Sequence, residues 1–217
     1  MREYFERKLN YLNESIIEMG NMVNTAITSS VTSLIDKDED LAEKVIEGDS
    51  YINMKDKEVE RLCIDLLLKE QPVASDLRFV TSVYKMTTDL ERIGDKAYDI
   101  AVSVKQMIKK GYKKSELGSV LKLAKLANEM LALAVKSFVE GSMELAEEAF
   151  KMDDNIDLLF EDVRKEVIYE MKNGDPSPTF ITDVLLVAKY LERIGDHAQN
   201  IAETVYFSLT AEEIVEE

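Results

Sequence analysis

The chain has 217 residues, of which 46% are hydrophobic, so it is long enough to bury one large or two small cores and is not a disordered protein. Its net charge is −16, from 43 acidic and 27 basic residues, and such a surface repels nucleic acid and acidic lipid headgroups. No stretch is apolar for long enough to span a membrane, and the first residues lack the apolar core of a signal peptide. We therefore expect a cytoplasmic protein whose partners are cations or other proteins, and which meets a membrane only through protein partners.

The first half of the chain predicts three helices, because apolar residues recur with helical spacing and no segment alternates with period two. The first helix keeps heptad spacing from Phe5 to Ala26 and ends near residues 36–38. The second runs from about residue 39 to residue 70, where Pro72 prevents its continuation. The third covers about residues 75–110.

The second half predicts three more helices of similar length. Residues 111–115 are the best candidate for the join between the halves. The fourth helix ends at Gly141, the fifth covers about residues 142–172, and residues 173–178 form the clearest loop. The sixth helix ends near Leu209. The sequence thus predicts an all-α fold of six long helices that form two pseudo-symmetric three-helix bundles, with residues 1–111 as the first repeat and residues 112–217 as the second.

One six-residue motif occurs twice in the chain, and it reads Leu-Glu-Arg-Ile-Gly-Asp both at 90–95 and at 191–196. On a helix, Leu90 and Ile93 belong to an apolar seam that continues toward Val104. Acidic residues form a second stripe beside it, and they are Glu91, Asp95 and Asp99 in the first copy and Glu192 and Asp196 in the second. Like charges four residues apart destabilise a helix slightly, so we expect a cation to lie near each stripe.

The second helices of the two halves also align, at an offset of 104 residues. Asp49 and Asp153 then occupy the same position, and both fall in the register of the apolar seam, where a carboxylate is expensive. Oxygen-rich sites of this kind suit hard cations such as Mg, Ca, Mn or Fe(III). The alternative is a solvated acidic face that is paired with Arg92, Lys96 and Arg193, and the residues leave both interpretations open.

Three motifs together resemble the PhoU family of phosphate-transport regulators. They are the segments at 71–78, 89–95 and 190–198, which read Gln-Pro-Val-Ala-Ser-Asp-Leu-Arg, Asp-Leu-Glu-Arg-Ile-Gly-Asp and Tyr-Leu-Glu-Arg-Ile-Gly-Asp-His-Ala. The resemblance covers essentially the whole chain. It implies two three-helix bundles and a cytoplasmic, usually dimeric protein. It also implies that the protein couples the ATPase subunit of the phosphate ABC transporter to a sensor histidine kinase, restraining phosphate uptake and repressing the phosphate-starvation response.

The resemblance also implies multinuclear iron or zinc clusters, with Mg or Mn as alternatives, on Glu/Asp-x-x-x-Asp motifs. Carried over to this sequence, the metal ligands are Glu91, Asp95, Asp99, Glu192 and Asp196, with Asp49, Asp153 and Asp157 facing them from the second helices. Two departures matter, because Asn53 stands where the second half has Asp157, and Asn200 stands where the first half has Asp99. His197 is a weaker candidate ligand, since Lys96 takes its place in the first copy.

Two other classes of protein remain open from the sequence. A metal-dependent enzyme with bridging carboxylates is one, although the chain lacks the Glu-x-x-His pair of di-iron helical bundles and any glycine-rich phosphate loop. A metal-free helical adaptor, in which the acidic stripes bind nothing, is the other. We expect a non-enzymatic regulator, with no catalytic residues.

Overall fold

The computed structural model describes residues 2–111, 118–173 and 178–214, and all regular structure in these residues is helical. The helices are α1 (Arg2–Asp36), α2 (Glu39–Glu70), α3 (Ala74–Lys110), α4 (Gly118–Glu140), α5 (Met143–Lys151), α6 (Asp153–Asn173) and α7 (Pro178–Thr210). The predicted all-α fold is therefore confirmed, and five of the six predicted helices have the expected bounds to within a few residues. None of the helices in the described ranges is long and apolar enough to cross a membrane.

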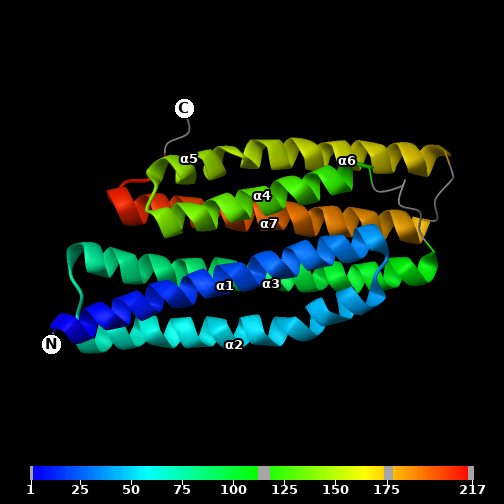
Figure 1. Ribbon diagram of the computed structural model, residues 1–217. Helices are drawn as coiled ribbons and strands as arrows, with labels where there is room; N and C mark the ends of the chain where they lie inside the picture. Colours follow the sequence, from blue (N-terminus) through cyan, green and yellow to red (C-terminus); the bar gives the residue numbers. More distant parts are fainter. Residues whose placement is uncertain (1, 112–117, 174–177, 215–217) are drawn as a thin grey trace.

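Two layers of roughly parallel and antiparallel helices make up the molecule (Figure 1). Helices α1, α2 and α3 pack together in one layer, and α4, α5, α6 and α7 pack together in the other. The layers meet mainly where α3 lies along α7, and α1 also contacts α4. The two predicted bundles are thus present. The predicted repeat limit at residues 111 and 112 borders a segment outside the described residues, so it stays a prediction.

The start of the second helix in each repeat has the same cap. The carboxylate of Asp38 accepts a hydrogen bond from the backbone N–H of Leu41 at 2.8 Å, and the hydroxyl of Ser142 accepts one from Leu145 at 3.2 Å. Such side chains satisfy donors that the first turn of a helix leaves free. Both pairs are 104 residues apart, so the duplication extends to the capping residues.

The predicted fifth helix was wrong in one respect, because it is interrupted at Met152. This residue caps the end of α5, and its carbonyl accepts hydrogen bonds from the N–H groups of Asn155 and Ile156 near the start of α6. Asp153 and Asp154 form the first turn of α6. Short acidic side chains favour the first turn, where they meet the positive end of the helix dipole, and they weaken a helix interior. The sequence here therefore favours a new helix start.

The seam of the duplicated motif forms part of the core. Leu90 and Ile93 on α3 are fully buried, and so are Leu191 and Ile194 on α7. Buried residues of both layers form one continuous hydrophobic cluster. The seam predicted from spacing is therefore confirmed, and it fixes the direction in which the acidic stripe of each helix faces.

Candidate functional site

The carboxylates of the first repeat gather between α2 and α3. We call this the α2/α3 acidic cluster, and its members are Asp49, Asp56, Glu91, Asp95 and Asp99, all half-buried. Gly94 allows the two helices to approach, since a Cβ at this position would lie 3.1 Å from Cγ2 of Ile52 on α2. The missing side chain brings the acidic faces of the two helices near one another.

Burial and neighbouring charges raise the pKa of two members of this cluster, Asp49 and Glu91. Burial, and then the charge of Asp95, raise the pKa of Asp49 above its usual value, while a hydrogen bond from the Asn53 amide at 2.7 Å partly offsets the shift. The pKa of Glu91 is raised by burial, then by Asp95 and Asp56. Because the negative charges are close and partly removed from water, a cation between α2 and α3 would be stabilised.

A second cluster lies in the equivalent place between α6 and α7. We call it the α6/α7 acidic cluster, and its members are Asp153, Asp154, Asp157, Glu192 and Asp196. Burial, followed by the charges of Asp157 and Asp196, raises the pKa of Asp153 to about 6. The approach at Gly195 is closer still than at Gly94, since a Cβ there would lie 2.9 Å from Cγ2 of Ile156 and 3.4 Å from Oδ1 of Asp153.

Each cluster contains one buried carboxylate oxygen that has no hydrogen-bond partner among the described residues. These two atoms are Oδ1 of Asp49 and Oδ1 of Asp153. A buried carboxylate oxygen without a donor is energetically unfavourable, so such atoms call for an explanation. The two aspartates hold the same position in the two repeats, which makes an accident of side-chain placement a poor explanation.

Other predicted ligands already have a basic partner on their own helix. Lys96 donates to Asp99 at 2.9 Å, Lys189 donates to Glu192 at 2.5 Å, and Arg193 lies 3.8 Å from Asp196. Asp157 is exposed. Within the described ranges, no three Asp, Glu, His or Cys side chains already converge so as to hold one ion. The intrahelical pairing that the sequence left open is thus present beside the two unpartnered oxygens.

His197 and Asn200 face the other repeat. Nδ1 of His197 lies 3.0 Å from Oδ1 of Asp89 on α3, and the Asn200 amide donates to the same oxygen at 3.3 Å. Asp89 is buried, and it was not among the site residues that the sequence predicted. Its position one turn before Ile93 puts it on the buried face of α3, and this signal could have identified it.

Comparison with known proteins agrees with this duplicated architecture. The PhoU domain matches the chain twice, over residues 16–104 and over residues 120–205. The chain belongs to the PhoU family. A PhoU relative from Clostridium acetobutylicum, described as a phosphate-specific transport system accessory protein PhoU homolog, is 33% identical over 98% of this chain and 97% of its own length.

Two solved PhoU structures share the fold over nearly the whole chain. PhoU from Pseudomonas aeruginosa superposes with a TM-score of 0.90 at 30% identity, covering 96% of this chain and all of its own. The phosphate transport system regulatory protein PhoU from Streptococcus pneumoniae gives 0.88 at 31% identity, covering 98% of this chain and all of its own. The family resemblance inferred from the three motifs is therefore confirmed.

Proposed function

We propose that this protein is a non-enzymatic accessory protein of a phosphate-specific transport system. The observation that supports it is the PhoU match in both repeats, together with relatives that are named as accessory or regulatory proteins of phosphate transport and are matched over almost their full length. In this role the protein lowers phosphate uptake and represses the phosphate-starvation response when phosphate is plentiful. It does so in the cytoplasm, as a homodimer that couples the ATPase subunit of the transporter to a sensor histidine kinase.

The test of this function is genetic. We expect that deleting the gene in its host raises phosphate uptake and turns on starvation-response genes in phosphate-rich medium, and that a plasmid copy reverses both effects. Uptake of labelled phosphate and a transcriptional reporter measure the two effects separately. Unchanged uptake together with unchanged reporter activity in the deletion strain would refute the assignment.

Metal binding is the second part of the proposal. Asp49, Glu91, Asp95 and Asp99 would hold a cation in the first repeat, and Asp153, Asp157, Glu192 and Asp196 would hold one in the second. The unpartnered Oδ1 atoms of Asp49 and Asp153 support this fit, because a carboxylate oxygen without a donor is a suitable ligand for a hard cation. The all-oxygen donor set suits iron, Mn or Mg, with zinc as the alternative that the resemblance implies. A bound cation would place positive charge beside the two unpartnered oxygens.

The metal content of the purified protein tests the proposed metal binding directly. Protein purified without chelator is expected to carry metal, and Asp49→Asn together with Asp153→Asn is expected to remove most of it. Inductively coupled plasma mass spectrometry quantifies the bound elements. Asp162→Asn is the matched control, because Asp162 is on α6 but pairs with Lys165 at the surface, outside the cluster. Equal metal content in both variants would contradict the proposal.

A further inference from the structure

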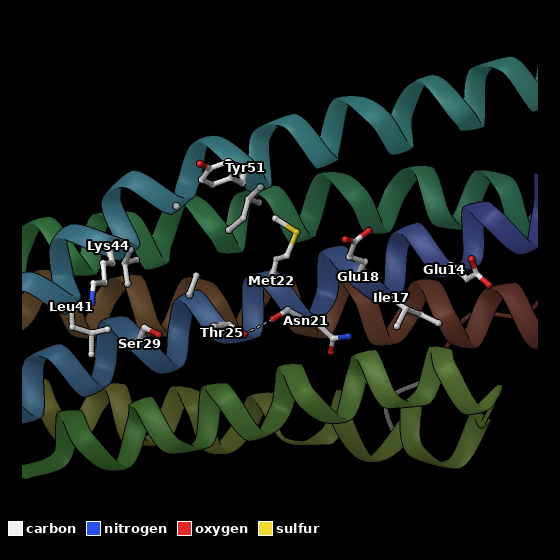
Figure 2. A pocket seen from close by; sticks show the side chains of 14 residues that line it. Glu14, Ile17, Glu18, Asn21, Met22, Thr25, Ser29, Leu41, Lys44 and Tyr51 are labelled. Atoms are coloured by element: carbon white, nitrogen blue, oxygen red, sulfur yellow. Dashed lines mark hydrogen bonds between the residues drawn. The ribbon is translucent and has the colours of Figure 1, made fainter.

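A groove runs between α1 and α2 in the first repeat. It encloses about 840 Å³. Its surfaces are mainly apolar, and Ile17, Met22, Leu41, Val45 and Ile52 are among the residues that line it. Figure 2 shows Met22 on α1 and Tyr51 on α2 facing the space between the two helices. Nothing lies within 4 Å of a Cβ built on Gly48, so this part of α2 borders open space.

The second repeat provides an internal comparison. At an offset of 104 residues, the buried serines Ser15 and Ser33 of α1 correspond to the buried serines Ser119 and Ser137 of α4, so the two first helices align without a gap. The same offset relates α2 to α5 and α6, because the capping residues Asp38 and Ser142 correspond. Each groove position in the first repeat therefore has a defined counterpart.

Three small residues of the groove correspond to large apolar residues. The pairs are Ala26 with Met130, Ser29 with Leu133, and Gly48 with Met152. Met130 is fully buried, and Leu133 and Met152 pack against the core. The second repeat thus has large side chains at the three positions where the first repeat has small ones. An exposed apolar groove is unfavourable unless something covers it, so the small residues point to an occupant.

The shape of the groove fits a helix. Its lining residues on α1 extend from Glu14 to Ser29, which spans about four turns or roughly 22 Å. The walls are two helices of a three-helix bundle, and a further helix laid between them would complete a four-helix packing. Amphipathic helices bind such grooves through apolar residues spaced three and four apart.

The charged residues at the two ends of the groove indicate the charge and orientation of the helix that would bind there. Glu14 and the largely exposed Glu18 lie at one end of the groove, whereas Lys44 lies at the other (Figure 2). Glu18 also pairs with Lys55 at 2.5 Å but keeps 63% of its side chain exposed. The whole chain carries a net charge of −16, which attracts a basic segment and repels an anionic membrane. A helix with its N-terminus, the positive end of its dipole, near Glu14 would match both ends.

We propose that this groove binds one basic, amphipathic helix of a partner protein. The inference goes beyond the proposed function, since it depends neither on phosphate nor on metal. The probe for its test is a labelled synthetic helix of about 18 residues with leucines three and four apart and lysines elsewhere, with a glutamate version as its acidic counterpart. Fluorescence anisotropy with the full chain measures binding. We expect saturable one-to-one binding of the basic helix and at least about tenfold weaker binding of the acidic one.

Groove-filling variants replace small residues of the groove with the large residues found at the corresponding positions of the second repeat. Gly48→Met and, separately, Ser29→Leu are expected to weaken binding of the basic helix at least about tenfold. Gln106→Met is the control, because Gln106 is exposed on α3 outside the groove. Circular dichroism checks folding, and the open space at Gly48 makes loss of fold an unexpected result for that variant. Equal affinity of wild type and both groove-filling variants would overturn the proposal.

Charge reversal separates the groove from general attraction to an acidic protein. Glu14→Lys is expected to weaken binding several-fold, whereas Glu148→Lys, the same change at an exposed site of the second repeat, is expected to have little effect. Equal losses would indicate nonspecific attraction and overturn the proposal. It would be overturned equally if Gly48→Met abolished self-association in sedimentation, or binding to vesicles of anionic phospholipid, while leaving binding of the basic helix intact.

Discussion

At the level of single residues, the acidic positions could be predicted but their partners could not. Helical spacing sufficed to put Glu91 and Asp95 on one stripe, because the period of a helix is fixed. Whether an oxygen is left without a donor depends on the distance between neighbouring helices, which spacing does not contain. The unpartnered oxygens of Asp49 and Asp153 were therefore visible only in three dimensions.

The raised pKa of Asp153 predicts a dependence of stability on pH. The folded value is about 6 and the ordinary value is 3.8, so the folded state binds this proton more tightly than the unfolded state. The contribution of Asp153 to stability is then greatest below about pH 4 and is lost as the pH rises to about 6. In metal-free protein at pH 7, we expect Asp153→Asn to raise the free energy of unfolding by about 1–2 kcal/mol.

Urea unfolding with chelator present measures this effect between pH 4 and pH 7. The gain from Asp153→Asn is expected to shrink toward zero at pH 4, where the wild-type carboxyl is protonated in the folded state. Asp162→Asn, at an exposed ion pair on the same helix, is expected to show no such trend. A gain that stays constant across this pH range would contradict the prediction.

At the level of helices, the bounds of five of the six predicted elements followed from the sequence. Pro72 marks a boundary by local chemistry alone, whereas residues 174–177 of the predicted loop at 173–178 lie outside the described residues. The break at Met152 was missed, because the apolar period continues through it from Ala149 to Ile156. Periodicity reports which face is buried, and it does not report where one helix stops and the next begins in the same direction.

The close contact at Gly195 gives a prediction about helix packing. A methyl group there would lie 2.9 Å from the buried Ile156, whose branched side chain has little freedom to move. We expect Gly195→Ala to destabilise the protein by about 1–3 kcal/mol, despite the better helix propensity of alanine. Thermal unfolding followed by circular dichroism measures the change.

Gly48 supplies the matched control for this substitution. Both glycines are inside helices, but a Cβ at Gly48 meets no atom within 4 Å. Gly48→Ala is therefore expected to stabilise the protein by up to about 1 kcal/mol through helix propensity alone. A stabilising effect of Gly195→Ala, like that expected for Gly48→Ala, would show that contact between α6 and α7 does not require a glycine.

At the level of the whole molecule, the sequence predicted the duplication but not how the two repeats pack against each other. The repeated motif predicted two bundles, and both are present. Nothing in the spacing indicated that α3 and α7 would lie together, since an apolar seam shows that a face is buried without showing against what. Polar contacts mark this meeting of repeats, where Asp89 contacts His197 and Asn200 and Lys110 pairs with the buried Asp183.

The contact at Asp89 predicts a coupling between the repeats. Asp89→Ala leaves the half-buried side chains of His197 and Asn200 without the carboxylate that they contact, so we expect a loss of about 1–3 kcal/mol. Differential scanning calorimetry is the measurement, and a broader or split transition would indicate that the repeats unfold less cooperatively. Asp162→Ala, which removes only a surface ion pair, is expected to change stability by less than about 1 kcal/mol. Equal effects of the two variants would contradict the prediction.

The difference between the two outer faces bears on stoichiometry. A chain with two identical repeats would offer two equivalent docking positions, and one copy could then crosslink two partner molecules into an extended network. Here Ala26, Ser29 and Gly48 line an open groove in one repeat, and the larger Met130, Leu133 and Met152 stand at the corresponding positions of the other. If the open groove is where a partner docks, each chain is monovalent there, and its complexes stay discrete instead of growing into polymers.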